Sequence, residues 1–159
     1  RVDRSTYRIP KNYLMKSLLL AFLALGFIAR AVALDAPPKE AVLFGHAQVD
    51  DAFAKGLPLL LNTSFKVQTG HRVMPGIVEI HDHDTDILYI TEGSATFVTG
   101  GTAQGAKAIE PGEIRADKIT GGVVHHLTKG DVIVIPAGVP HWFSEVSGTC
   151  LYFVVKVTK

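Results

Sequence analysis

The chain of 159 residues has room for one domain with a substantial hydrophobic core and is too short for two ordinary domains. Hydrophobic residues make up 47% and charged residues 19% of the sequence, which is typical of a globular protein and excludes a disordered chain. Six of the 16 basic residues but only one of the 15 acidic residues precede Leu34, which leaves 10 basic and 14 acidic residues in the rest of the chain. This remainder lacks the positive charge that nucleic-acid phosphates require, so we expect no nucleic-acid partner.

The N-terminal segment has the order of a secretory signal peptide. A lysine follows Met15, residues 18–29 form an apolar run, and residues 31–33 read Ala-Val-Ala. A membrane-spanning helix needs roughly 20 apolar residues, and this run is shorter. We therefore expect residues 15–33 to be a signal peptide that is cleaved after Ala33. The mature protein would be periplasmic or secreted, without stable membrane insertion.

Two features of this segment bear on that interpretation. Arg30 lies between the apolar run and the cleavage site, which also fits an uncleaved anchor or a helix packed on the domain. Residues 1–14 precede Met15, whereas a signal peptide begins at its initiator methionine. We interpret residues 1–14 as an upstream extension.

The leading part of the mature chain, residues 34–64, contains one helix signal. Asp50 and Asp51 lie near the start of the segment 49–55, Lys55 lies at its end, and Gly56 follows. Negative charge near the start of a helix and positive charge near its end are both favoured by the helix dipole. The pattern predicts a short leading helix over residues 49–55.

From Phe65 onward the sequence is typical of an all-β domain, because short segments rich in Val, Ile, Thr, Tyr and Phe alternate with Gly, Pro and Asp. The predicted strands are residues 65–69, 76–83, 87–91, 95–99, 123–127, 131–135, 141–146 and 151–157. Closure into a barrel or a double-sheet jelly roll would remove the exposed edges of so many strands. We predict one β-barrel over residues 65–159, with the glycine-rich stretch 100–122 as a long loop outside it.

Two histidines lie two residues apart near the end of a predicted strand. Side chains at positions i and i+2 leave the same face of a strand, so His81 and His83 would point into one space. A tight turn at residues 84–85 would bring Asp86 back beside them across a hairpin, in phase with Leu88. These three side chains are predicted to be metal ligands.

A third histidine, His141, follows an apolar strand that ends in a Pro/Gly turn. If its strand lies opposite the first one, three imidazole nitrogens and one carboxylate converge. Such a set suits one divalent transition metal (Fe, Mn, Ni, Cu or Zn), whereas Ca and Mg prefer oxygen ligands. The predicted metal site is therefore His81, His83, Asp86 and His141, with coordination positions left for water, dioxygen or substrate.

These residues resemble the two sequence motifs of the cupin superfamily, in particular of its small single-domain members. The first motif is matched, with shortened spacing and an aspartate in place of glutamate, by Gly76, His81, His83, Asp86 and Gly93. The second motif is matched at the family spacing by Gly130, Pro136, Gly138 and His141. The resemblance implies a single cupin β-barrel, a double-stranded jelly roll, with the metal near one end of its interior. It also implies a homodimer as the common oligomeric state.

Two glutamates are candidate catalytic residues. Glu79 is in phase with His81, and Glu145, which stands where the second cupin motif has asparagine, is in phase with His141. A carboxylate facing the barrel interior could act as a general base or support a metal ligand. The alternative for each is an exposed glutamate at the end of a strand.

The cupin barrel carries many activities, so the fold alone does not choose among them. One hypothesis is a metal-dependent dioxygenase, in which the metal holds a small organic substrate beside dioxygen. The alternative is a non-catalytic, exported barrel that binds a metal or a small ligand. In both cases the expected partner is a small molecule.

Overall fold

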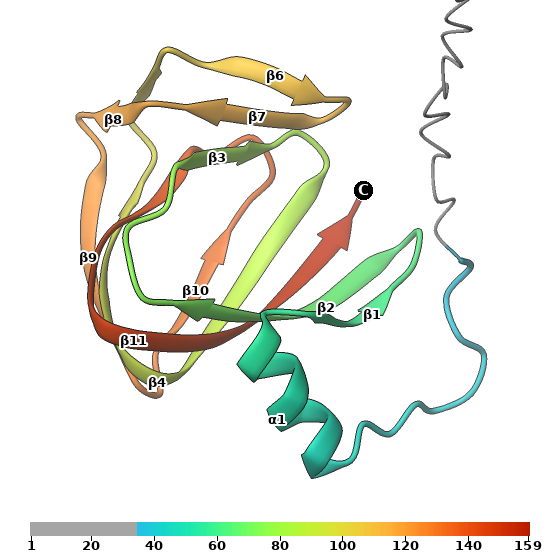
Figure 1. Ribbon diagram of the computed structural model, residues 1–159. Helices are drawn as coiled ribbons and strands as arrows, with labels where there is room; N and C mark the ends of the chain where they lie inside the picture. Colours follow the sequence, from blue (N-terminus) through green and yellow to red (C-terminus); the bar gives the residue numbers. More distant parts are fainter. Residues whose placement is uncertain (1–34) are drawn as a thin grey trace, which may run out of the picture. The chain divides into compact units, whose positions relative to one another are not determined.

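The computed structural model describes residues 35–159, and the predicted signal peptide over 15–33 and extension over 1–14 lie outside the described residues. The expected all-β fold with one short leading helix is confirmed (Figure 1). In chain order the elements are α1 (His46–Lys55), β1 (Pro58–Leu61), β2 (Phe65–Arg72), β3 (Val78–His81), β4 (Asp84–Thr99), β5 (Thr102–Gln104), β6 (Lys107–Glu110), β7 (Glu113–Ala116), β8 (Lys118–Thr120), β9 (Val123–Thr128), β10 (Val132–Ile135) and β11 (His141–Thr158).

Helix α1 begins earlier than predicted, at His46 rather than residue 49, because residues 46–48 already form a helical turn. The backbone N–H groups of Gln48 and Val49 donate to the carbonyl oxygen of Gly45. The side-chain oxygen of Gln48 accepts a hydrogen bond from the backbone N–H of Gly45 at 3.0 Å, which satisfies a group at the helix start. At the other end Gly56 adopts the left-handed conformation (φ 63°), and its backbone N–H donates to carbonyl oxygens of the last turn, those of Ala52 and Phe53. The helix therefore ends where the sequence predicts.

Two long strands, β4 and β11, pair antiparallel along most of their length and belong to two layers at once. In one layer the C-terminal half of β11 lies between β2 and the N-terminal half of β4, with β1 and β10 outside them. In the other layer the N-terminal half of β11 lies between β3 and the C-terminal half of β4, with β7, β6 and β9 outside. This curving pair of strands links the two layers of the jelly roll (Figure 1).

The strand predictions were correct in type but incomplete in extent. The expected strands 87–91 and 95–99 are one strand, β4, and those over 141–146 and 151–157 are one strand, β11. The stretch 100–122 was wrongly predicted as a long loop, because it contains β5 to β8. Strand β7 of this stretch pairs with β3, so it belongs to the main sheet.

The hydrophobic core fills the space between the two layers. Phe97 and Phe143 from one layer meet edge to face at 4.7 Å between ring centroids, and Phe143 stacks on Tyr152 of the other layer at 4.9 Å. Alternation along β4 and β11 sends these side chains inward. In the part of the chain that the structure describes, no helix is long and apolar enough to cross a membrane.

The bend of the β4–β11 pair depends on Gly93. The register between the two strands shifts after Ser147, and opposite this irregularity Gly93 has a positive φ of 75°. A Cβ atom on Gly93 would overlap the backbone carbonyl oxygen of Thr149. The close backbone approach at the bend therefore requires glycine here.

We predict that Gly93→Ala destabilises the fold much more than Gly148→Ala. Both positions have similar positive φ angles, 75° and 70°, so both variants carry a left-handed penalty of about 1–2 kcal/mol. Only Gly93→Ala adds the collision with Thr149, which costs a further ~1–3 kcal/mol. Urea unfolding of the two variants measures the difference, and equal losses would show that the bend tolerates a side chain.

Candidate metal site

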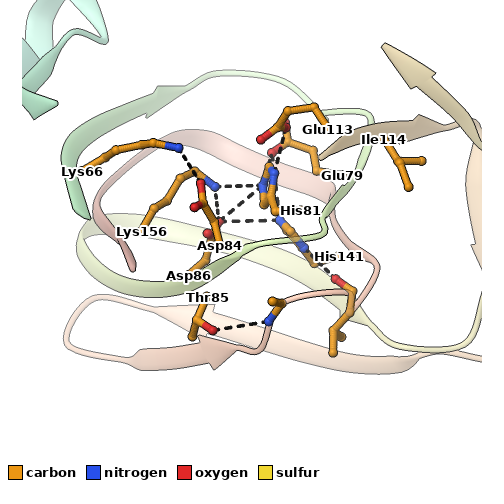
Figure 2. A network of polar contacts seen from close by, with 12 residues as sticks. Lys66, Glu79, His81, Asp84, Thr85, Asp86, Glu113, Ile114, His141 and Lys156 are labelled. Carbon is orange, nitrogen blue, oxygen red and sulfur yellow. Dashed lines mark hydrogen bonds and ion pairs between the residues drawn. The ribbon is translucent and has the colours of Figure 1, made fainter. Parts of the chain in front are cut away.

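The candidate site is built from two cross-strand pairs that belong to different layers. In one layer His141 on β11 is directly opposite Glu79 on β3. In the other layer Lys156 on β11 is directly opposite Asp86 on β4. The side chains of both pairs meet in the barrel interior together with His81, the last residue of β3 (Figure 2).

Both imidazoles are held with Nε2 toward the centre of this group. Nδ1–H of His81 donates to the carboxylate of Glu113 at 2.8 Å, and Nδ1–H of His141 donates to the carbonyl oxygen of Val139 at 3.0 Å. A hydrogen bond at Nδ1 of this kind fixes the tautomer and the ring orientation of a metal-binding histidine. The two rings lie 5.1 Å apart between centroids.

Ligand atoms of Glu79, His81 and His141 all lie within 4.8 Å of one another, as a shared ion requires. Oε2 of Glu79 is 3.6 Å from Nε2 of His81 and 3.9 Å from Nε2 of His141. Oδ2 of Asp86 is 3.6 Å and 3.8 Å from the same two nitrogens. Two imidazoles with one or two carboxylates form a donor set that fits a divalent transition metal.

The protonation states of Glu79 and His141 agree with such a role, whereas His81 differs, because burial would lower its pKa but the contact with Glu79 and the charges of Asp86 and Glu113 outweigh burial and raise that pKa. Burial alone would raise the pKa of Glu79, but the contact with His81 and the charge of Arg115 outweigh burial and lower that pKa to about 2. Burial lowers the pKa of His141, which favours a neutral imidazole with a free electron pair. A carboxylate and a neutral imidazole are the forms that bind metals.

A lysine ammonium contacts two members of this group, His81 and Asp86. Nζ of Lys156 donates to Oδ2 of Asp86 at 2.5 Å and lies 2.8 Å from Nε2 of His81 (Figure 2). The second carboxylate oxygen of Asp86, Oδ1, is buried without a hydrogen-bond partner among the described residues. The other oxygen of this carboxylate, Oδ2, is the one that lies near the two imidazole nitrogens, and an unsatisfied carboxylate oxygen fits an additional cation ligand.

The structure places His83 outside the group. Strand β3 ends at His81, and His83 is exposed beside Gly112 at the turn between β6 and β7. The predicted strand over 76–83 was therefore wrong at its end, and the two histidines do not share a strand face. The predicted hairpin was also wrong, because β3 and β4 do not pair and Asp86 meets His81 across the barrel.

The two predicted glutamates have different positions. Glu79 faces the site, as its phase with His81 predicts. Glu145 is exposed and accepts a hydrogen bond from Thr96 at 3.0 Å, which agrees with the alternative of an exposed glutamate and not with an inward one. A register shift between Phe143 and Glu145 reverses the alternation after His141.

Sequence reasoning missed two polar residues of the site, Glu113 and Lys156. Lys156 carries a readable signal, since it is in phase with the buried Tyr152 and Val154 on a predicted apolar strand. Glu113 carries none, because it lies in the stretch interpreted as a loop. Its position follows from the pairing of β7 with β3, where Glu113 is opposite His81.

A pocket of about 200 Å³ adjoins the site within the barrel. Its polar wall includes Glu79, Asp86, His141 and Lys156. Its other walls combine Gln68, Thr69 and Arg72 with apolar and aromatic residues, among them Leu88, Trp142, Phe143, Tyr152 and Val154. A pocket with apolar walls and converging polar groups can hold a small molecule.

Comparison with known proteins decides the family. The sequence model of the Cupin family matches residues 34–159. The chain belongs to the cupin family. As a cupin it shares its fold with a Bacillus halodurans protein of known crystal structure, at 16% identity and a TM-score of 0.56 over 80% of this chain and 87% of that one. No curated protein sequence matches this cupin significantly.

A second solved structure aligns with most of this chain. It is an uncharacterized conserved protein with a double-stranded beta-helix domain from Klebsiella pneumoniae, 19% identical, with a TM-score of 0.49. The alignment covers 75% of this chain and 91% of that chain.

The end of the cupin barrel next to the site is held by Asp84. Its carboxylate accepts hydrogen bonds from Nζ of Lys66 at 2.6 Å and from the hydroxyl of Thr158 at 2.7 Å, which ties β4 to β2 and β11. Burial would raise the pKa of Asp84, but the hydrogen bonds from Lys66 and Thr158 outweigh it and lower that pKa. The charged carboxylate therefore stabilises the folded state.

We predict that Asp84→Asn lowers the free energy of unfolding at pH 7 by about 1.5–3 kcal/mol. Because the folded-state pKa lies below its ordinary value of 3.8, this contribution is complete above pH 3.8 and is lost as the pH falls further. The gap between wild type and variant should therefore narrow below pH 3.8 in denaturant unfolding experiments. The neighbouring, exposed Asp82 gives the matched control, since Asp82→Asn should change stability by less than about 0.5 kcal/mol.

Proposed function

We propose that this cupin binds one divalent transition metal through His81, His141 and Glu79, with Asp86 as a fourth ligand. The observation that carries the proposal is the orientation of the two imidazoles. A hydrogen bond at Nδ1 fixes the orientation of each ring. Each ring directs Nε2 toward the same two carboxylates, those of Glu79 and Asp86. Fe, Mn, Ni, Cu and Zn all suit this mixed donor set.

The adjoining pocket supports a small organic ligand as the partner of the metal. Engineered apolar cavities of about 150 Å³ hold benzene, so a pocket of about 200 Å³ has room for a single-ring compound or a short chain. Its aromatic and aliphatic walls would contact the apolar part of such a ligand. A bound metal would supply a Lewis acid with open positions for that ligand and for dioxygen.

The enzymatic form of the proposal is a metal-dependent dioxygenase that acts on a small organic substrate. Glu79 lines the pocket and lies 3.6 Å from Nε2 of His81, so a carboxylate oxygen that is not bound to metal is placed to accept a substrate proton. Glu145 is exposed and is left out of this role. The alternative remains a non-catalytic barrel that binds a metal or a small ligand. For either form, the signal-peptide pattern over residues 15–33 supports export.

We predict that His81→Ala and His141→Ala each weaken metal binding by more than about 100-fold, because each removes an inward Nε2 ligand. Isothermal titration of the purified, metal-free protein with Zn²⁺ and Ni²⁺ measures the affinity. His83→Ala is the matched control and should bind both metals as the wild type does. If His83→Ala loses binding while His81→Ala retains it, the ligand set proposed here is wrong.

Oxygen consumption distinguishes the enzyme from the binding protein. The Fe²⁺-, Mn²⁺-, Ni²⁺- and Cu²⁺-loaded proteins are tested with single-ring catechols, short β-diketones and thiols, and a flavonol serves as the oversized comparison. We expect turnover of a single-ring or short-chain compound that His141→Ala abolishes, and little turnover of the flavonol because of the pocket volume. Bound metal without turnover of any compound would instead favour the non-catalytic barrel.

A further inference from the structure

The inward direction of Lys156 follows from the strand and not only from one side-chain conformation. On β11 the buried side chains of Cys150, Tyr152 and Val154 alternate with more exposed ones, and Lys156 is next in this series. Its backbone is also directly opposite Asp86 on β4. The lysine side chain is only 13% exposed. The fold therefore directs the Lys156 ammonium at the proposed metal ligands.

The ammonium and a metal ion would need the same atoms. Nε2 of His81 has one electron pair, which receives the hydrogen bond from Lys156 at 2.8 Å. Oδ2 of Asp86, which lies within 3.8 Å of both imidazole nitrogens, is bound to the same ammonium. A metal on these atoms would also have to tolerate a positive charge at contact distance, which is strongly unfavourable in a buried site.

We propose that Lys156 is the resident cation of this site and that a divalent metal binds only when it displaces the Lys156 ammonium from His81 and Asp86. This inference rests on the proposed metal-binding function and adds that Lys156 limits the affinity for the metal. Lys156 also lines the two pockets next to the site, so the displaced side chain has space to move into. As long as no metal is bound, Lys156 remains the positive partner of the buried Asp86 carboxylate.

Displacement has a quantitative consequence for every metal. If the lysine-bound form makes up 90–99% of the metal-free protein, the apparent affinity falls by about 10- to 100-fold for each metal, by the same factor. The relative order of metals is unchanged. Only metals that bind imidazole and carboxylate tightly then retain enough affinity to occupy the site.

The first test compares metal affinities of Lys156→Met and Lys66→Met. Methionine keeps an unbranched side chain of similar length and removes the charge. Lys66 is the matched control, because it is opposite Lys156 on the neighbouring strand and pairs with Asp84 at 2.6 Å, and because the structure shows no hydrogen bond or ion pair between Lys66 and His81 or Asp86. We expect Lys156→Met to bind Zn²⁺ about 10- to 100-fold more tightly than wild type, and Lys66→Met to change the affinity less than about threefold.

The second test uses the wild-type protein and covers the case in which Lys156→Met does not fold. The side-chain nitrogen signals of Lys156 and Lys66 are followed by NMR during titration with Zn²⁺. We expect the Lys156 signal to shift or to broaden as its hydrogen bonds are lost, while the Lys66 signal stays in place. A Lys156 signal that is unchanged at full Zn²⁺ occupancy would overturn the inference.

The outcomes separate this inference from the proposed function. If wild type binds Zn²⁺ and neither lysine variant tightens binding, or both tighten it equally, displacement is overturned and the metal site stands. If only Lys156→Met binds Zn²⁺, displacement is supported and metal binding by the natural chain is overturned. If neither protein binds any metal of the series, both proposals fail.

Discussion

The antiparallel pairing of β4 with β11 is the constraint on which the rest of the structure depends. The two strands run through both layers, so each contributes residues to the core and to the site. Strand β11 has His141 near its start and Lys156 near its end. Because the strand bends between the layers, these two positions, far apart in the sequence, meet in one space. The candidate site is thus a consequence of how one strand is bent.

Charge balance is the second constraint on this site. Glu79 and Asp86 direct carboxylates into the barrel, and Asp86 is almost fully buried. Buried carboxylates need a positive partner, since an unpaired one is strongly destabilising. Lys156 supplies this partner from within the chain. In the proposed metal-bound form, a divalent metal would supply the same neutralisation with more ligands.

Much of the site could be predicted from the sequence because strand alternation is a strong signal. The phases of Glu79 and His81, of Asp86 with Leu88, and of Lys156 with Tyr152 all follow from a period of two. Alternation fails where the register shifts, and Glu145 shows this, since the irregularity after Phe143 turns it outward. A bulge of this kind has no signal in the residues themselves.

The remaining failures have a topological cause. The sequence shows that β3 is followed at once by a second strand, and the simplest interpretation is a hairpin. In the structure β3 pairs with β7 and β11, and residues 82–83 carry the chain to the other layer. Pairing partners far away in the sequence cannot be read from local pattern. Glu113, which is brought to His81 by such a pairing, could not be foreseen either.

The short connection between β3 and β4 also explains why the site differs from the cupin motif that it resembles. Only residues 82 and 83 separate the two strands, and they are held in the turn by backbone hydrogen bonds, from Asp82 N–H to Gly112 and from Lys159 N–H to the carbonyl of His83. His83 therefore cannot extend β3. The residue that shares the inward face with His81 at a spacing of two is instead Glu79. A His-x-His pair in the sequence thus becomes a Glu-x-His pair in space, with one imidazole fewer and one more carboxylate. The added negative charge is balanced by an inward cation, and in this chain Lys156 is placed to provide it.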